Sequence, residues 1–259
     1  MKILAIQNRM GIGDMIIFLP FIEEISKKFG VPISILVKES SKADQYLKNT
    51  EYIKEIILLK RNNDSNGEHD GMNGFVKLSR DIKKYQFDKA IIFNSSLRFN
   101  LICKLARIKE IYQYPLFEKN EQHLINAAEK LLKEKFKIDS VNNPKIQINK
   151  DDIKYAERKF EFNKNKINVL LGIGGSGPTK RVPAYKFVEL IKKIKKKYDS
   201  RFFLATGTKI EEQKILKEIL NNNAEDCIAL DKLSISETLP IIKNCNISVC
   251  NDSSFSHIS

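Results

Sequence analysis

Short apolar runs alternate with amphipathic segments along most of this chain, and this alternation restricts its fold more than any other feature. In the second half, four apolar runs too short for helices are predicted to be strands: 167–172, 201–206, 227–230 and 247–250. Three segments between them have the spacing of helices: 184–197, 210–222 and 234–243. Strands connected through helices pair in parallel, so the sequence predicts an α/β fold with a doubly wound parallel sheet.

The first half has the same alternation. Strands are predicted at 3–6, 33–37, 53–59 and 89–93. The segment 138–150 contains Asn-Asn-Pro and little periodicity, which is typical of a linker. We therefore expect two domains, 1–145 and 151–259. The polar stretch 60–73 is expected to be a mobile loop with His69 in solvent.

The stretch 168–187 leads from a predicted strand through several glycines to a predicted helix. Gly174, Gly175 and Gly177 are expected to adopt positive φ and to let the backbone approach a ligand. A helix beginning near Pro183 would direct its unpaired N–H groups at the loop, and such groups attract anions.

Side chains in this loop add to the expected anion site. Lys180 and Arg181 supply cations, and the hydroxyls of Ser176 and Thr179 supply further donors. Such a set could hold a diphosphate without a metal, whereas an ordinary turn with two solvated basic residues is the alternative. GxxxxGK[ST] cannot be fitted here and GxGxxG fits only as an isolated match, so the loop indicates an anion without saying which.

Two other predicted strands of the second half also end in polar residues. Gly207 and Glu211 follow one, and Asp252, Ser253 and His257 follow the last. Carboxyl ends of parallel strands are where α/β proteins bind ligands. The structural alternatives are a first-turn carboxylate for Glu211, an N-cap for Asp252 and a solvated His257.

Gly13 and Asp14 follow the first predicted strand, where a helix begins. An N-cap is the structural alternative for Asp14, because aspartate is a favoured cap and complements the helix dipole.

Composition excludes some classes of protein. The formal net charge is +13, but no segment interleaves basic with aromatic residues, so nucleic-acid binding is not indicated. The lysine-rich segment 192–197 fits the solvated end of a helix, and an anionic membrane surface is the alternative. Four cysteines without CxxC spacing favour core thiols in a reducing compartment and no metal site. Without a signal peptide or a long apolar stretch, we expect a cytoplasmic protein, soluble or peripheral.

Four motifs occur in a fixed order: Gly11-Ile12-Gly13-Asp14, TKRVP at 179–183, Gly207 followed by Glu211, and NDSSFSH at 251–257. Together they resemble glycosyltransferase family 9, the ADP-heptose:lipopolysaccharide heptosyltransferases. The resemblance implies the GT-B arrangement, in which two Rossmann-like domains face a cleft. It also implies a bacterial enzyme that transfers heptose from ADP-heptose to a lipopolysaccharide acceptor with inversion, and that needs no metal or other cofactor.

The resemblance also implies roles for individual residues. Asp14 would be the general base, and Lys180 would hold the diphosphate and stabilise the departing ADP. Glu211 would bind the ribose of the nucleotide. Other substrate-binding residues would be Gly13, Gly174, Gly175, Ser176, Thr179, Gly207, Asp252, Ser253 and His257. The acceptor would be a lipopolysaccharide core or another glycan, with possible peripheral contact at the cytoplasmic face of the inner membrane.

Two departures from the family pattern shape these expectations. Ser254 stands where the family usually has glycine, and the chain stops at Ser259 where a helix should continue. The second domain is therefore expected to be incomplete, and a non-catalytic or fragmentary nucleotide-sugar-binding module is the alternative function. A dinucleotide oxidoreductase is disfavoured because the first strand is not followed by a full GxGxxG.

Overall fold

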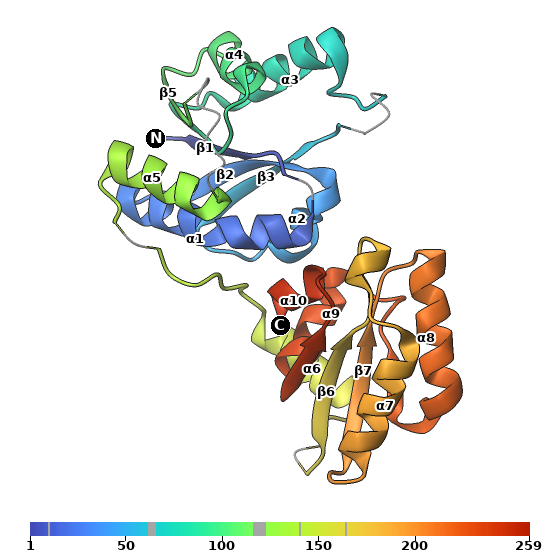
Figure 1. The fold of residues 1–259 in the computed structure, drawn as a ribbon. Helices are drawn as coiled ribbons and strands as arrows, with labels where there is room; N and C mark the ends of the chain where they lie inside the picture. The colour runs from blue at the N-terminus through green and yellow to red at the C-terminus, as the bar shows by residue number, and fades with distance from the viewer. Residues whose placement is uncertain (10, 62–65, 116–122, 140, 164) are drawn as a thin grey trace. The chain divides into compact units, whose positions relative to one another are not determined.

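The chain folds into two compact units, Met1–Gln147 and Ile148–Ser259 (Figure 1). A computed structural model describes residues 1–9, 11–61, 66–115, 123–139, 141–163 and 165–259. Each unit is a parallel sheet covered by helices on both faces.

The first unit has a five-stranded parallel sheet in the order β3-β2-β1-β4-β5. Its strands are β1 (Ile3–Gln7), β2 (Ile33–Lys38), β3 (Ile53–Leu59), β4 (Lys89–Ile92) and β5 (Glu110–Gln113). Its α-helices are α1 (Ile12–Phe29), α2 (Ala43–Tyr46), α3 (Gly71–Tyr85), α4 (Leu97–Leu105) and α5 (Leu124–Phe136). The strand order reverses at β1, so the connections after β1 and β4 leave toward opposite faces of the sheet.

The apolar runs of the sequence explain this sheet. All five residues of β1 are buried, as expected of a central strand covered on both faces. Leu4 and Ile6 pack with Leu78 of α3 and Phe99 of α4 in one core. Helices α1 and α5 cover the other face of the sheet, as Figure 1 shows.

The second unit has a four-stranded parallel sheet in the order β8-β7-β6-β9. Its strands are β6 (Ile167–Gly172), β7 (Ser200–Ala205), β8 (Cys227–Ala229) and β9 (Ile247–Cys250). Its α-helices are α6 (Lys150–Lys159), α7 (Ala184–Lys195), α8 (Ile210–Asn223), α9 (Ile235–Lys243) and α10 (Ser254–Ile258). The predicted α/β fold with doubly wound parallel sheets is confirmed.

Alternate residues of β6 enter two separate cores. Val169 and Leu171 pack with the apolar faces of α7 and α8, whereas Leu170 packs with Phe203 and with Ile241 of α9. The alternation is the period of two that a strand imposes on its side chains. Both faces of β6 are therefore covered, which explains its uninterrupted apolar sequence.

The prediction that His69 is solvated was wrong. His69 is only 5% exposed, and its Nδ1 accepts a hydrogen bond of 3.1 Å from the Lys60 N–H. Next to it, Asp70 Oδ1 pairs with Arg61 Nε at 2.8 Å. A Cβ on Gly74 would lie 2.2 Å from the His69 carbonyl carbon, so the first turn of α3 packs directly on this segment. Residues 62–65 lie outside the described residues.

Candidate functional site

Most of the predicted site residues lie at the carboxyl edge of the second sheet. The glycine loop, residues 173–183, follows β6 at the centre of that edge. Gly207 follows the neighbouring strand β7, and Asp252 follows β9 on the other side. Because the strand order reverses at β6, this edge is the place where doubly wound sheets bind ligands.

Gly174 and Gly175 in the loop are required for space and not for positive φ. The described glycines with positive φ are Gly11, Gly30 and Gly71, so the prediction of positive φ at Gly174, Gly175 and Gly177 was wrong. A Cβ on Gly174 would lie 2.7 Å from Oε1 of Glu212, and one on Gly175 would lie 2.6 Å from the Lys180 carbonyl oxygen. No described atom lies within 4 Å of a Cβ on Gly177.

A buried carboxylate, Glu212, lies against the glycines. Glu212 is 7% exposed, and its Oε1 accepts a hydrogen bond of 2.8 Å from the Gly175 N–H. Its Oε2 would lie 2.6 Å from a Cβ on Gly207. This side chain therefore joins two glycine segments, and it accepts a hydrogen bond from an N–H group of the loop that was expected to bind an anion.

Sequence reasoning selected the neighbouring residue, Glu211. The Glu211 side chain is 63% exposed, and its Oε2 lies 4.0 Å from Arg181 Nη1. Helical register was the signal that could have identified Glu212, because Leu216 and Ile219 are buried in the core and Glu212 precedes Leu216 by four residues. The role of Glu211 in binding ribose stays a prediction.

Lys180 and Asp252 are brought together from the ends of β6 and β9. The Lys180 Nζ lies 2.8 Å from Asp252 Oδ2, and both side chains are exposed. The hydrogen bond from Lys180 lowers the pKa of Asp252 below its usual range. The ammonium group of Lys180 is therefore held over the loop by a carboxylate that an anionic ligand could replace.

Asn251 fastens the glycine loop to β9. It is buried, its Nδ2 donates to the Ile173 carbonyl at 2.8 Å, and its Oδ1 accepts from the Val182 N–H at 3.3 Å. The sequence motif contained Asn251, but no role was predicted for it. Its two hydrogen bonds make it a structural tie across the site.

Two buried hydroxyls at this edge have no hydrogen-bond partner among the described residues. They belong to Thr206, which follows β7, and to Ser253. Ser253 is the N-cap position of α10, so the alternative of Asp252 as the cap is wrong. His257 is exposed, as are Ser176 and Thr179 in the loop.

Gly13 and Asp14 lie in the first turn of α1, in the first unit. The N-cap is Gly11, whose φ of 113° favours glycine, so the alternative of Asp14 as the cap is wrong. A carboxylate oxygen of Asp14 lies 3.6 Å from where a Cβ on Gly11 would stand. The Gln7 side chain orders the turn, because its Nε2 donates to the Asp14 carbonyl oxygen at 3.3 Å.

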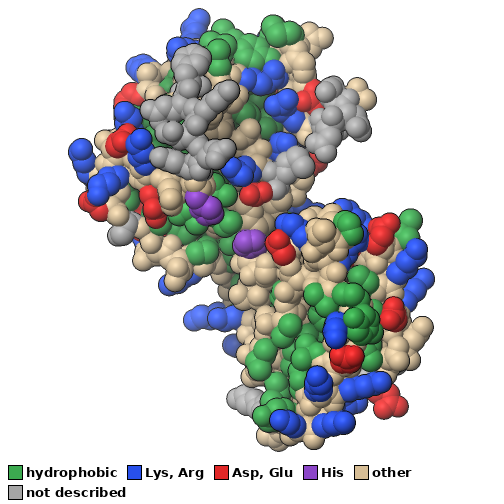
Figure 2. Space-filling model, viewed as in Figure 1, with side chains coloured by type: hydrophobic (Ala, Val, Ile, Leu, Met, Phe, Trp, Pro, Cys, Tyr) green, Lys and Arg blue, Asp and Glu red, His purple; other side chains and the backbone are tan. Residues whose placement is uncertain are grey.

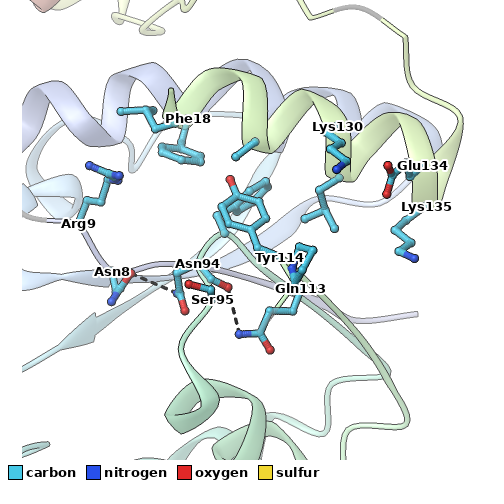
Figure 3. Close-up of a pocket in the computed structure, with 15 residues that line it drawn as sticks. Asn8, Arg9, Phe18, Asn94, Ser95, Gln113, Tyr114, Lys130, Glu134 and Lys135 are labelled. Carbon is cyan, nitrogen blue, oxygen red and sulfur yellow. Dashed lines mark hydrogen bonds between the residues drawn. The ribbon is translucent and has the colours of Figure 1, made fainter. Parts of the chain in front are cut away.

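A cavity of about 570 Å³ opens at the carboxyl edge of the first sheet (Figure 3). Its floor comes from the ends of β1, β4 and β5, and one wall comes from α5. Asn94 Nδ2 donates to Asn8 Oδ1 at 3.1 Å across the switch point between β1 and β4. The lining residues are Asn8, Arg9, Phe18, Phe93, Asn94, Ser95, Gln113, Tyr114, Pro115, Leu124, Ala127, Lys130, Leu131, Glu134 and Lys135.

The lining combines aromatic surface with cations. Phe93 packs edge to face against both Phe18 and Tyr114. The Tyr114 hydroxyl is buried without a partner among the described residues, and burial raises the pKa of Tyr114. Arg9 lies at one end of the cavity and Lys130 and Lys135 at the other (Figure 3). Such a lining suits a ligand with a ring face, a hydrogen-bonding group and negative charge.

Within the described part of the chain, no group of three or more His, Cys, Asp or Glu side chains is arranged to hold a metal ion. The four cysteines are free thiols: Cys103 and Cys227 are buried, and Cys245 and Cys250 are half-buried. No helix in that part of the chain is long and apolar enough to cross a bilayer.

Comparison with known proteins places this architecture in a family. The sequence model of glycosyltransferase family 9 (heptosyltransferase) matches residues 75–259. No curated protein matches the chain. Many solved structures also match this chain, and the three named below share its fold at low sequence identity.

The first is ADP-heptose lps heptosyltransferase II of E. coli, with a TM-score of 0.75 and 18% identity over 100% of this chain and 81% of that chain. A glycosyl transferase family 9 protein from Veillonella parvula gives a TM-score of 0.78 and 18% sequence identity, over 99% of this chain and 77% of that chain. E. coli heptosyltransferase WaaC with ADP gives a TM-score of 0.69 and 14% sequence identity, over 100% of this chain and 83% of that chain.

Proposed function

Since the chain belongs to glycosyltransferase family 9, we propose that it transfers a heptose or a related sugar from an ADP-sugar to a lipopolysaccharide core or a related glycan, with inversion. The observation that carries this proposal is the Lys180 ammonium, held at 2.8 Å by Asp252 beside the glycine loop. The names of two solved neighbours, an ADP-heptose lps heptosyltransferase and a heptosyltransferase with ADP, support the donor and acceptor class.

Lys180 would bind the diphosphate of the donor. Phosphate oxygens would replace the Asp252 carboxylate at Nζ, so the cation would change partners without being left unpaired. Negative charge grows on the leaving ADP as the bond to the sugar breaks, and a positioned ammonium stabilises that charge without a metal. The hydroxyls of Ser176, Thr179 and Ser253 are further donors at this edge.

Asp14 would be the general base. Inversion proceeds by one displacement, so a single base must take the proton of the acceptor hydroxyl on the face opposite the leaving group. The first turn of α1 stabilises a carboxylate through the helix dipole. The Gln7 side chain fixes the backbone of this turn through its hydrogen bond to the Asp14 carbonyl oxygen.

The cavity of the first unit would receive the acceptor. Its aromatic walls suit the apolar face of a sugar ring, and Arg9, Lys130 and Lys135 suit acidic or phosphorylated groups. Its position at the carboxyl end of β1 is next in sequence to the turn that carries Asp14.

Calorimetric titration with ADP, UDP and NAD, in the presence of a chelator, tests the proposal. ADP is expected to bind without metal and at least 10-fold more weakly to Lys180→Ala, because the diphosphate loses its cation. Lys186→Ala is the matched control, since Lys186 is an exposed lysine of α7 that pairs with Glu189. Binding of NAD alone would contradict the proposal.

A transfer assay with ADP-heptose then separates an enzyme from a binding module. Wild type is expected to transfer the sugar, and Asp14→Asn is expected to lose 100-fold or more of that rate while it still binds ADP, since general bases contribute ~10²–10⁴-fold. If both proteins bind ADP and neither transfers sugar to any acceptor, the non-catalytic module is the correct function.

A further inference from the structure

Helix α4 has apolar side chains on both of its faces. Phe99, Ile102 and Cys103 point into the core of the first unit, with at most 1% of each exposed. On the other side, Leu97, Leu101 and Leu105 are 51%, 41% and 54% exposed. These three, which we call the leucine face, are spaced four residues apart and therefore lie along one side of the helix.

Exposed cations border the leucine face. Lys104 follows Leu97 by seven residues, which places it on the same side of the helix, and Arg107 and Lys109 follow the helix end. All three are exposed, and none forms an ion pair with a described residue. The segment 89–109 contains no Asp or Glu, and Glu110 is paired with Lys89.

The adjacent helix α3 also carries exposed cations. It packs against α4 and adds exposed Arg80 and Lys83, while its Asp81 pairs with Lys84. Figure 2 shows hydrophobic side chains gathered over α3 and α4 at the top of the view, with Lys and Arg side chains at their margin. An exposed apolar strip with a basic margin is the combination that binds anionic lipid, because leucines enter the interface while cations meet the headgroups.

We propose that the leucine face of α4 and the cations Lys104, Arg107 and Lys109 dock the protein on the surface of an anionic lipid bilayer. The inference rests on the proposed function, since a lipopolysaccharide acceptor is itself anchored in a bilayer. A second copy of the chain fits this surface less well. A twofold contact would bring the same cations of both copies together across the leucines.

Co-sedimentation of the full chain with phosphatidylcholine vesicles, with and without phosphatidylglycerol, tests the proposal. Wild type is expected to bind only when phosphatidylglycerol is present. The variant K104Q/R107Q/K109Q is expected to bind about 100-fold more weakly, since each cation near an anionic surface contributes about fivefold. The variant L97Q/L101Q/L105Q is expected to bind at least ~10-fold more weakly, because it lacks apolar side chains to insert.

The control is K192Q/K193Q/K196Q, which removes the same charge from exposed lysines at the end of α7. Its binding is expected to stay within twofold of wild type. Equal weakening by this control, unchanged binding of the leucine variant, or no binding of folded wild type to either vesicle would each overturn the proposal. So would a dimer in analytical ultracentrifugation that the leucine variant abolishes, since a second copy would then cover the face.

Calorimetry with ADP on the same preparations separates this inference from the proposed function. If the protein binds ADP but does not bind anionic vesicles, the docking surface is contradicted and the proposed function is not. If the protein binds the vesicles through α4 but binds no ADP, the proposed transferase function is contradicted and the docking surface is not. Circular dichroism of each variant checks that its fold is retained, and the substituted side chains are all exposed.

Discussion

At the residue scale, Glu211 and Glu212 are adjacent in sequence and opposite in environment. Glu212→Ala is expected to lower the free energy of unfolding by about 1–3 kcal/mol, because the buried Gly175 N–H would lose its acceptor. Glu211→Ala is expected to change it by no more than about 0.5 kcal/mol, as is usual for an exposed side chain. Urea unfolding followed by circular dichroism measures both.

Glu212→Gln supplies the control for this pair. Its side-chain oxygen can still accept from Gly175 N–H, so most of the stability lost in Glu212→Ala should return. Equal losses for Glu211→Ala and Glu212→Ala would show that the glycine segments do not depend on the buried carboxylate.

His69 makes the stability of the protein depend on pH. Burial lowers the pKa of His69 below its ordinary value of 6.5, against the opposing influence of Glu68 and Asp81. The unfolded chain therefore takes up a proton near pH 6.5 that the folded chain does not, and the free energy of unfolding falls as the pH decreases from 7 to 5. Chemical denaturation at several pH values in this range measures the slope.

His69→Asn is the variant that isolates this effect. The Asn side-chain oxygen can accept from Lys60 N–H in place of Nδ1 but has no proton to gain, so the slope between pH 7 and 5 should become smaller. Glu68 contributes mainly below this range, because Lys77 and Lys60 hold its folded-state pKa at about 2 and the unfolded chain takes up the corresponding proton only near pH 4.5. An unchanged slope would mean that other groups cause the pH dependence.

His69 and Glu212 show where a sequence pattern no longer predicts the environment of a side chain. A histidine in a stretch rich in Asn, Asp and Gly looks solvated, and only the packing of Gly74 on its backbone reveals that it is buried. Glutamate at two successive positions of a helix start looks interchangeable until the helix is packed. Burial of a polar group depends on neighbours that are distant in sequence, and local composition does not encode them.

At the scale of elements, the end of α4 has an arginine where helices usually have glycine. Arg107 adopts φ 63°, its N–H donates to the Lys104 carbonyl, and Ile108 N–H donates to the Cys103 carbonyl. These two bonds form a Schellman motif, whose left-handed residue is most favourable as glycine. Arg107→Gly is thus expected to raise the free energy of unfolding by about 1 kcal/mol.

The same substitution should weaken binding to phosphatidylglycerol vesicles about fivefold, because it removes one cation. Arg107→Ala separates the two effects, since alanine removes the charge but retains the unfavourable backbone conformation. It should weaken vesicle binding equally without the gain in stability. Thermal unfolding and co-sedimentation on the three proteins measure both outcomes, and equal stability of both variants would contradict the argument.

The elements themselves were largely predictable. Apolar runs of four to seven residues became strands, and the helices between them appear where their spacing predicted. The geometry of the glycine loop was not predictable in the same way. Its glycines are needed for contact with Glu212 and the Lys180 carbonyl, and those contacts arise only when α8 and the loop meet.

At the scale of the whole molecule, each unit has its own core. The cores are built from β1, β2, α3 and α4 in the first unit and from both faces of β6 in the second. Residues 141–149 connect the units without regular secondary structure, and Gln147 Oε1 accepts from Glu51 N–H at 2.9 Å. The alternation of short apolar runs with amphipathic segments predicted the two sheets, because each sheet is built from strand–helix–strand units that are local in sequence.

Limited trypsin digestion is therefore expected to cut after the exposed Lys145 and to leave a fragment beginning at Ile146 that persists. The fragment should retain its helical circular dichroism and unfold cooperatively, since its described sheet and cores are built from residues of the second unit itself. Lys145→Gln should remove this cut without altering the spectrum. Rapid degradation of the fragment would mean that the second unit needs the first in order to fold.

The hydrogen bonds of Asn251 also set an order of events during synthesis. Asn251 lies 78 residues after Ile173, to which it donates, and it accepts from Val182 in the same loop. A ribosome releases the chain from its N-terminus, so the first unit folds while the later strands are still being made. Strand β6 and its loop leave the ribosome well before Asn251, so the loop lacks the two hydrogen bonds of Asn251 until that residue has been synthesised. The segment proposed to hold the nucleotide thus takes its final shape only after Asn251 has been synthesised.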